Sequence, residues 1–208
     1  MSEPSTSQAN LPDAAGPVML RLAREAIEAG LADRQPPEPQ GEGFLDEPGA
    51  VFVTLTQRGS LRGCIGSLEP HRPLGRDVQQ NAQAAAFGDP RFSPLRPEEL
   101  DFTQIEVSVL SKEEPINFTD RADLLEQLRP GIDGLVVQAA GRRATFLPQV
   151  WDQLPHKGQF VSHLLRKAGL PDTYWGPDVR VWRYTVQAFE EPATDATVDD
   201  AAAPAPTE

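Results

Sequence analysis

Cysteine is almost absent from this sequence of 208 residues, in which Cys64 is the only one. A single cysteine can close no disulfide within the chain and can supply no cysteine-based zinc site, so a reducing, intracellular setting is the simplest interpretation. The three histidines, His71, His156 and His163, show no i, i+4 spacing and no carboxylate in a recognised metal pattern beside them. The sequence therefore predicts neither a metal site nor a cofactor.

Long hydrophobic runs and targeting signals are missing as well. No stretch approaches the roughly 18 apolar residues that a membrane-spanning helix needs. The first residues, MSEPSTSQANLPDAAG, lack both the basic start and the apolar core of a secretory signal. A Gly-rich phosphate loop, a serine elbow and a dinucleotide fingerprint are also absent. We therefore expect a cytoplasmic protein that does not contact a membrane.

Positive charge is scarce, with 19 basic against 31 acidic residues and a net charge of −12. Eight of the acidic residues and none of the basic ones lie in residues 1–16 and 190–208, so the acidity is largely a property of the ends. Both ends are rich in Pro, Ala, Thr and Ser and have little to bury. We expect them to be disordered and to flank one folded domain at residues 17–189.

Nucleic acid is not an expected partner, because the folded part has no excess of basic residues to bind phosphates. The expectation would change only if one cluster of bases gathered on a single face. That cluster is Arg142, Arg143, Arg166 and Lys167.

Apolar residues spaced by three and four positions predict helices in several segments. These segments are about 17–32, 73–87, 119–128 and 158–168, with a short helix at 149–153. Residues 33–49 contain four prolines and indicate an extended connector, and residues 89–100 indicate a loop fixed by prolines.

Alternation of apolar and polar residues predicts antiparallel strands between these helices. The expected strands are 51–56, 61–68 and 104–110, a hairpin at 134–148 that turns at Gly141, and one final strand at 179–189. The first two are joined by a tight turn at Arg58-Gly59-Ser60. Antiparallel hairpins mixed with helices and long loops give an α+β fold.

The lone cysteine lies in LRGCIGSL, residues 61–68, between Gly63 and Gly66 and two residues after Arg62. Strand alternation places Arg62, Cys64 and Gly66 on one face, where the glycine would let a backbone or a ligand approach. A guanidinium close to the sulfur would favour the thiolate. Three interpretations stay open: a small buried hydrophobe beside a glycine-marked bulge, a binding site, and a nucleophilic or redox thiol.

Two further features could contribute to a site near the cysteine. His71 follows it by seven residues and could fold back to pair with it. In GDPRF, residues 88–92, Asp89 and Arg91 flank a proline at a helix end, where polar groups are held rigidly. They form either a clasp within the loop or part of a ligand cleft.

Six blocks of sequence, taken in order, resemble the AMMECR domain family, which in bacteria and archaea is often labelled AmmeMemoRadiSam system protein A. The blocks are LRGCIGSL, DPRFSPL with the following EEL, IEVSVLSKEEPI, GIDGLVVQ, ATFLPQVW and FVSHLLRKAGL. LRGCIG is the signature of the family, and the resemblance covers about residues 17–189. It implies antiparallel sheets with flanking helices in a larger lobe, which holds both termini, and a smaller lobe. The signature would face a cleft between these lobes.

The resemblance supplies no reaction, because the family has no settled activity. Its label implies association with a radical SAM enzyme and with a Memo-like protein, which resembles metal-dependent dioxygenases. This chain lacks a CxxxCxxC motif and cannot itself be the radical SAM component. We expect a binding or accessory component with an unknown ligand; the alternative is an enzyme that uses Cys64 as nucleophile or redox thiol. The expected cleft residues are Arg62, Gly63, Cys64, Gly66, His71, Asp89 and Arg91.

Overall fold

The computed structural model describes residues 11–12, 14–40 and 43–192. Most of the two terminal segments that we expected to be disordered lies outside the described residues. Where the segments are described, that expectation is wrong. Ala15 and Gly16 belong to the first helix, and Glu190 ends the last strand, so the folded domain is wider than residues 17–189 at both ends.

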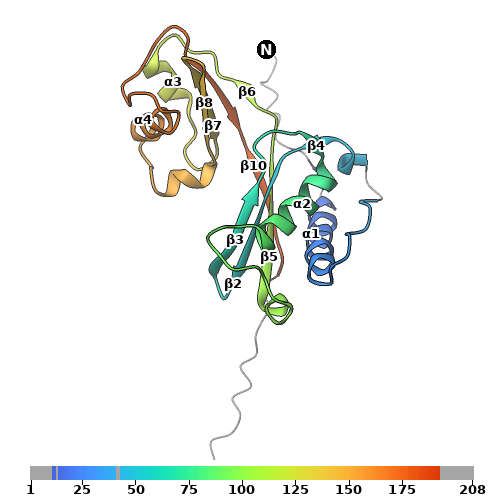
Figure 1. The fold of residues 1–208 in the computed structure, drawn as a ribbon. Coiled ribbons are helices and arrows are strands. Elements are labelled where there is room, and N and C mark those ends of the chain that lie inside the picture. The colour runs from blue at the N-terminus through green and yellow to red at the C-terminus, as the bar shows by residue number, and fades with distance from the viewer. Residues whose placement is uncertain (1–10, 13, 41–42, 193–208) are drawn as a thin grey trace, which may run out of the picture.

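The first lobe is a four-stranded antiparallel sheet with two helices on one of its faces (Figure 1). In spatial order the strands are β10 (Val186–Glu190), β5 (Thr103–Leu110), β2 (Val51–Gln57) and β3 (Ser60–Gly66). The helices are α1 (Ala15–Leu31) and α2 (Leu74–Phe87). Alternate residues of the strands face the apolar stripes of the helices, and Val51, Val53 and Leu55 are completely buried between them.

Short elements complete the first lobe. The proline-rich connector contains a 3-10 turn, η1 (Gly43–Leu45), and a two-residue strand, β1 (Pro48–Gly49), which pairs with β4 (Arg72–Pro73). The loop fixed by prolines ends in a second 3-10 segment, η2 (Pro97–Phe102). Both segments that we expected to lack regular structure therefore carry short pieces of it.

The second lobe is a separate antiparallel sheet with its own core. In spatial order its strands are β6 (Glu114–Pro115), β9 (Arg180–Tyr184), β7 (Gly134–Ala139) and β8 (Arg142–Phe146). Its helical segments are α3 (Arg121–Gln127), η3 (Pro148–Asp152) and α4 (Lys157–Lys167). Phe160 of α4 lies at the centre of this core, stacked on Trp151 with ring centroids 3.7 Å apart.

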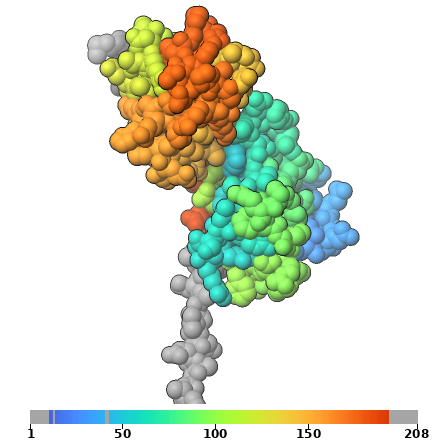
Figure 2. All heavy atoms as spheres, turned by 60° about the vertical axis from the view of Figure 1, so that its left-hand side comes forward, coloured from blue at the N-terminus to red at the C-terminus, as the bar shows by residue number. Residues whose placement is uncertain are grey.

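The chain crosses between the two sheets twice, and the two crossings lie side by side. Residues 111–113 lead from β5 to β6, and Thr185 leads from β9 to β10. Ser111 donates its backbone N–H to the Thr185 carbonyl oxygen, while the Thr185 N–H donates to the Ser111 hydroxyl, both at 2.9 Å. The prediction of one final strand at 179–189 is therefore wrong, because that segment serves two sheets. Figure 2 shows the two lobes in contact, with an indentation between them on one side.

The main expectations about secondary structure and fold class are confirmed. All four long helices are present within a few residues of their expected bounds, both hairpins form, and the fold is α+β with antiparallel sheets and flanking helices. The hairpin turns place Arg58 and Gly59, and Ala140 and Gly141, at positive φ, as tight hairpin turns require. No helix in the described part of the chain is long and apolar enough to span a bilayer.

The packing of α2 on β3 generates a prediction about Gly63. A Cβ atom at this position would overlap the backbone carbonyl oxygen of Ala85 in α2, and a backbone atom cannot move aside cheaply. We expect Gly63→Ala to lower the free energy of unfolding by about 2–3 kcal/mol, as overpacking of a close contact does. Chemical denaturation of the purified protein measures this change.

Gly158 of α4 provides the matched control, because a Cβ there would meet no atom within 4 Å. Gly158→Ala should leave the stability unchanged or raise it by up to about 1 kcal/mol. Equal stability of the Gly63→Ala and wild-type proteins would contradict the role that the structure gives to Gly63.

Candidate functional site

A bulge in β3 changes the direction of the residues around the cysteine. Leu55 of β2 pairs with Gly63 and Thr56 with Leu61, so Arg62 is an extra residue without a partner on β2. The prediction that Arg62 continues the alternation of Cys64 and Gly66 is therefore wrong. One of the interpretations left open combined a buried cysteine with a glycine-marked bulge. The strand pairing shows the bulge beside Gly63, whereas Cys64 is only partly buried.

The Arg62 guanidinium pairs with a carboxylate rather than with the sulfur. Its Nε and Nη2 donate to the two oxygens of Glu99 in η2 at 3.1 and 3.2 Å. The pair is mostly buried, with 12% and 19% of the two side chains exposed. The guanidinium, helped by the Arg96 backbone N–H, lowers the pKa of Glu99 from its ordinary 4.5 to about 2 despite the opposing effect of burial. Arg62 therefore ties the edge strand to η2.

The space beside both glycines is filled by other parts of the protein. At Gly63 the backbone of α2 approaches, and at Gly66 the aromatic ring and the backbone of Phe52 do so. Phe52 is the cross-strand partner of Gly66, and its ring covers the position that a side chain would take. The absence of side chains at the two glycines therefore makes room for neighbouring parts of the protein.

Asp89 and Arg91 clasp the backbone of Cys64. The Cys64 N–H donates to Asp89 Oδ2 at 2.9 Å, and Arg91 Nη2 donates to the Cys64 carbonyl oxygen at 3.2 Å. Arg91 also pairs with Asp89 through two nitrogens, at 2.9 and 2.6 Å. Arg91 is the main cause, and the Cys64 N–H the second, of a pKa of Asp89 well below its usual range. On the open edge of β3, these two side chains take the place of a neighbouring strand.

The sulfur of Cys64 lies on the face of the first sheet that α1 and α2 do not cover, because Cys64 is opposite Thr54 in the strand pairing. Within the described residues, its one side-chain hydrogen-bond partner is the Thr54 hydroxyl, which donates to Sγ at 3.4 Å. The two nearby arginines, Arg62 and Arg91, are both engaged by carboxylates. Neither a catalytic base nor an unpaired cation is therefore in contact with the thiol among the described residues.

His71 is not hydrogen-bonded to Cys64. It is largely exposed, and its Nε2 lies 3.6 Å from a carboxylate oxygen of Glu69. His71 contributes instead to a hollow at the junction of the two lobes. Of the seven expected cleft residues, the structure groups Cys64 with Asp89 and Arg91, while His71 stands apart from them.

Two adjoining hollows lie where the lobes meet. The smaller one, here called the junction pocket, has a volume of about 210 Å³ and includes Val136, Thr145 and Tyr184 of the second sheet. The larger one, here called the groove, has a volume of about 870 Å³ and extends along β1 to Phe44 and His71. Both are lined by Leu68, Glu69, Leu110, Ser111, Glu113 and Arg143. Arg62, Cys64 and Gly66 line neither of them.

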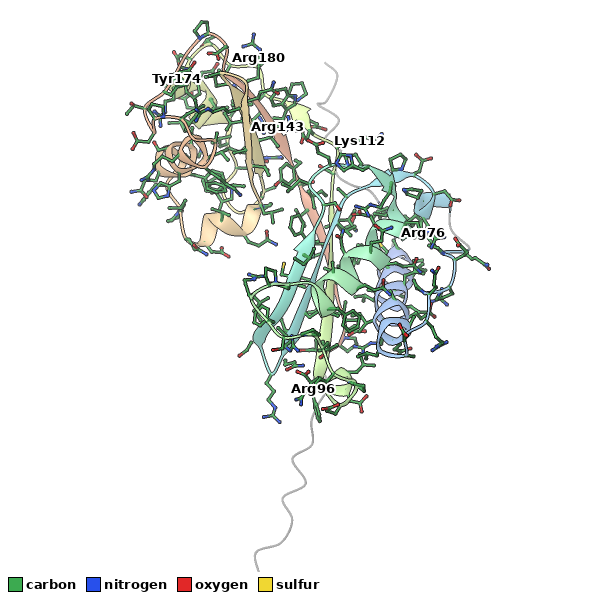
Figure 3. The ribbon with its side chains drawn as sticks, viewed as in Figure 1. Arg76, Arg96, Lys112, Arg143, Tyr174 and Arg180 are labelled. Atoms are coloured by element: carbon green, nitrogen blue, oxygen red, sulfur yellow. The ribbon has the colours of Figure 1, made fainter. Side chains whose placement is uncertain are left out.

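Arg143 connects the lobes across these hollows. It stands on β8, in the second lobe, and Figure 3 shows it on the side of that lobe that faces the junction. Its Nη2 donates to both oxygens of Glu113, at 2.6 and 2.8 Å, and its Nε lies 3.6 Å from Glu69, in the loop after β3. Its guanidinium carbon is 5.5 Å from the centre of the Trp182 ring, with which it makes a cation–π contact.

Most of the basic residues whose clustering would have indicated a nucleic-acid site are paired with other groups of the protein. Arg142 donates to the Gly169 carbonyl oxygen, Lys167 donates to that of Thr145, and Arg143 pairs with Glu113. No group of three His, Cys, Asp or Glu side chains in the described ranges is placed to hold a metal ion.

The chain is similar to proteins from several archaea and to a solved structure. A family model described as AMMECR1 matches residues 20–189. A protein from Methanothermobacter thermautotrophicus is 41% identical over 185 residues, covering 85% of this chain and 94% of the relative. One from Thermofilum pendens is 38% identical, covering 85% and 89%. The crystal structure of uncharacterized protein PH0010 from Pyrococcus horikoshii matches with a TM-score of 0.76 at 35% identity, covering 88% of this chain and 94% of that one.

The Arg62–Glu99 pair makes the free energy of unfolding decrease as the pH falls into the acid range. Because folding lowers the pKa of Glu99, the stabilisation by its ionised form is complete above pH 4.5 and is lost as the pH falls toward 2. Glu99→Gln should lower the free energy of unfolding at pH 7 by about 2 kcal/mol, because it removes a charged hydrogen-bond partner of a mostly buried arginine. Its stability should then fall less steeply than that of the wild type between pH 4.5 and 2.

Denaturant titrations at a series of pH values measure both effects. Glu98→Gln is the control, because Glu98 is the neighbouring residue of η2 and its side chain is 64% exposed. It should leave the profile unchanged. Parallel profiles for Glu99→Gln and the wild type would contradict the structural role of the pair.

Proposed function

This chain belongs to the AMMECR1 family, and we propose that it is a non-catalytic binding protein that receives a ligand at the junction of its lobes. One observation carries the proposal. The hollows there combine apolar walls, contributed by Leu68 and Leu110, with charged groups from both lobes, Glu69 and Arg143. Convergent polar groups in a mostly apolar hollow are the usual features of a ligand site.

We further propose that the protein acts in the cytoplasm as an accessory component of a system with a radical SAM enzyme and a Memo-like protein. The support is the resemblance of its six sequence blocks to the family whose label names such a system. With Cys64 as its only cysteine, the chain cannot hold the iron–sulfur cluster that radical SAM chemistry needs, so the radical step belongs to a partner. An accessory role would then be to bind the substrate or to present it.

The surroundings of Cys64 support binding rather than thiol chemistry. A nucleophilic cysteine is activated by a neighbouring base or by an unpaired positive charge. Here the arginines on either side, Arg62 and Arg91, are paired with Glu99 and Asp89. The carboxylates neutralise the charges that would otherwise stabilise a thiolate.

One contact favours the second candidate, an enzyme that uses Cys64 as nucleophile or redox thiol. The Thr54 hydroxyl donates to the sulfur, and a hydrogen bond to sulfur stabilises the thiolate. The partial exposure of Cys64 also leaves it within reach of a substrate.

The rate of alkylation by iodoacetamide at pH 7.5 separates the two candidates. We expect Cys64 to react no faster than glutathione, because the thiol is partly shielded and both nearby arginines are paired. A rate well above that of glutathione, reduced by Thr54→Val, would support the enzyme and contradict the binding protein. Circular dichroism of the variant provides the folding control.

Two leucines of similar exposure provide a matched test of the binding site. Leu68 lines both hollows and is 45% exposed, whereas Leu61 on β3 lines neither and is 44% exposed. We expect Leu68→Asp to weaken retention of the radical SAM and Memo-like proteins, or of a small molecule, by about tenfold or more, because it puts a charge into the apolar wall. Leu61→Asp and Cys64→Ser should retain them as the wild type does.

The measurement is co-purification of each variant with the two proteins from the same organism, followed by mass spectrometry of the small molecules retained. Since both leucines are exposed, the aspartate variants should fold equally well, which thermal unfolding checks. Equal loss in the Leu61→Asp and Leu68→Asp variants, or loss only in Cys64→Ser, would contradict a site at the junction.

A further inference from the structure

We propose that the groove binds a ligand with one carboxylate and an apolar body, and that Glu69 occupies the place of that carboxylate when no ligand is bound. The inference rests on the proposed function, because it assigns a ligand class to the site at the junction. The observation that carries the inference is the position of the Glu69 side chain. It lies between His71 and Arg143, two groups that bind carboxylates.

Glu69 is held loosely from both sides. One oxygen lies 3.6 Å from His71 Nε2 and the other lies 3.6 Å from Arg143 Nε, and both distances exceed those of a hydrogen bond. Half of its side chain, 51%, is exposed. Long contacts of this kind between partly exposed side chains contribute little to stability, so another carboxylate can replace Glu69 at small cost.

Glu113 differs from Glu69 in each of these respects. It accepts two hydrogen bonds from Arg143 Nη2, at 2.6 and 2.8 Å, and only 28% of its side chain is exposed. We therefore expect Glu113 to stay in place when a ligand enters. Among the described residues, Nε and Nη1 of Arg143 make no hydrogen bond, so the guanidinium keeps N–H donors for a second carboxylate.

A second cation lines the groove. Lys112 lies on the segment that connects β5 to β6, and it has no ion-pair partner within 4.0 Å among the described residues. Figure 3 shows Lys112 on the connection between the lobes and Arg143 on the second lobe. Both positive groups line the same groove and add to the attraction of a negatively charged ligand there.

The rest of the groove decides between ligand classes. Its apolar lining includes Phe44, Leu68, Leu74 and Leu110, which suits a hydrocarbon body. Glu47 and Glu113 also line it and oppose the entry of a doubly charged anion such as a phosphate monoester. One carboxylate satisfies the available donors with the least repulsion.

Three probes of equal chain length test the inference: octanoate, octan-1-ol and octylammonium, each titrated calorimetrically into the full chain at pH 7.5. We expect octanoate to bind most tightly. Arg143→Gln should weaken octanoate binding by about tenfold or more, because a charged hydrogen bond is lost. Glu69→Gln should strengthen it by about two- to fivefold, because the competing carboxylate is removed.

Arg76→Gln is the matched control. Arg76 on α2 is 36% exposed against 37% for Arg143, it also pairs with a glutamate, Glu38, and it lies outside the groove. It should leave octanoate affinity unchanged. Lys112→Gln is the second variant if Arg143→Gln fails to fold, because Lys112 is exposed, and it should also weaken octanoate binding.

Several results would overturn the inference. Octanol or octylammonium binding as tightly as octanoate would exclude a carboxylate site, and weaker octanoate binding by Glu69→Gln would exclude the substitution of Glu69 by the ligand. Absence of binding by all three probes would also overturn it. Each of these leaves the proposed function standing if the Leu68→Asp variant still loses the partners or small molecules that the Leu61→Asp variant retains.

Discussion

The hydrogen-bonded pair of crossings at Ser111 and Thr185 is the constraint on which the rest of the structure depends. Each lobe has its own buried core, and these two strand-to-strand connections join the sheets. Because Ser111 and Thr185 exchange two hydrogen bonds, the two connecting segments pass from one lobe to the other side by side. The uncovered faces of the two sheets therefore meet beside that point, and the hollows with Leu110 and Arg143 form there.

The LRGCIG segment supports this arrangement mainly by packing. Gly63 lets α2 approach the edge strand, Arg62 ties that strand to η2, and the Asp89–Arg91 clasp completes the hydrogen bonds of Cys64. β3 leads directly into the loop that carries Leu68 and Glu69. A rigid strand thus positions the residues that line the junction, which lie a few positions beyond the signature.

Sequence periodicity predicts helices and strands well here because each lobe buries one face of each element, as in α1 and β2. It fails at residues 179–189, where the alternation continues from β9 into β10 and the change of sheet leaves no mark in the pattern. Periodicity does not reveal the residues of the junction either, because Leu68 and Glu69 lie far from Arg143 in the chain. An apolar residue at the end of the predicted strand 61–68, Leu68, was the only local signal. The bulge at Arg62 explains why strict alternation misplaced its side chain.

Hydrogen–deuterium exchange of the protein, alone and mixed with the radical SAM and Memo-like proteins that we propose as partners and with their small molecules, tests most directly whether the junction is the binding site. Our account predicts added protection of the backbone in residues 67–74, 110–113 and 142–145, which surround the two hollows. Protection confined to residues 61–66 and 89–92, around the thiol, would contradict it.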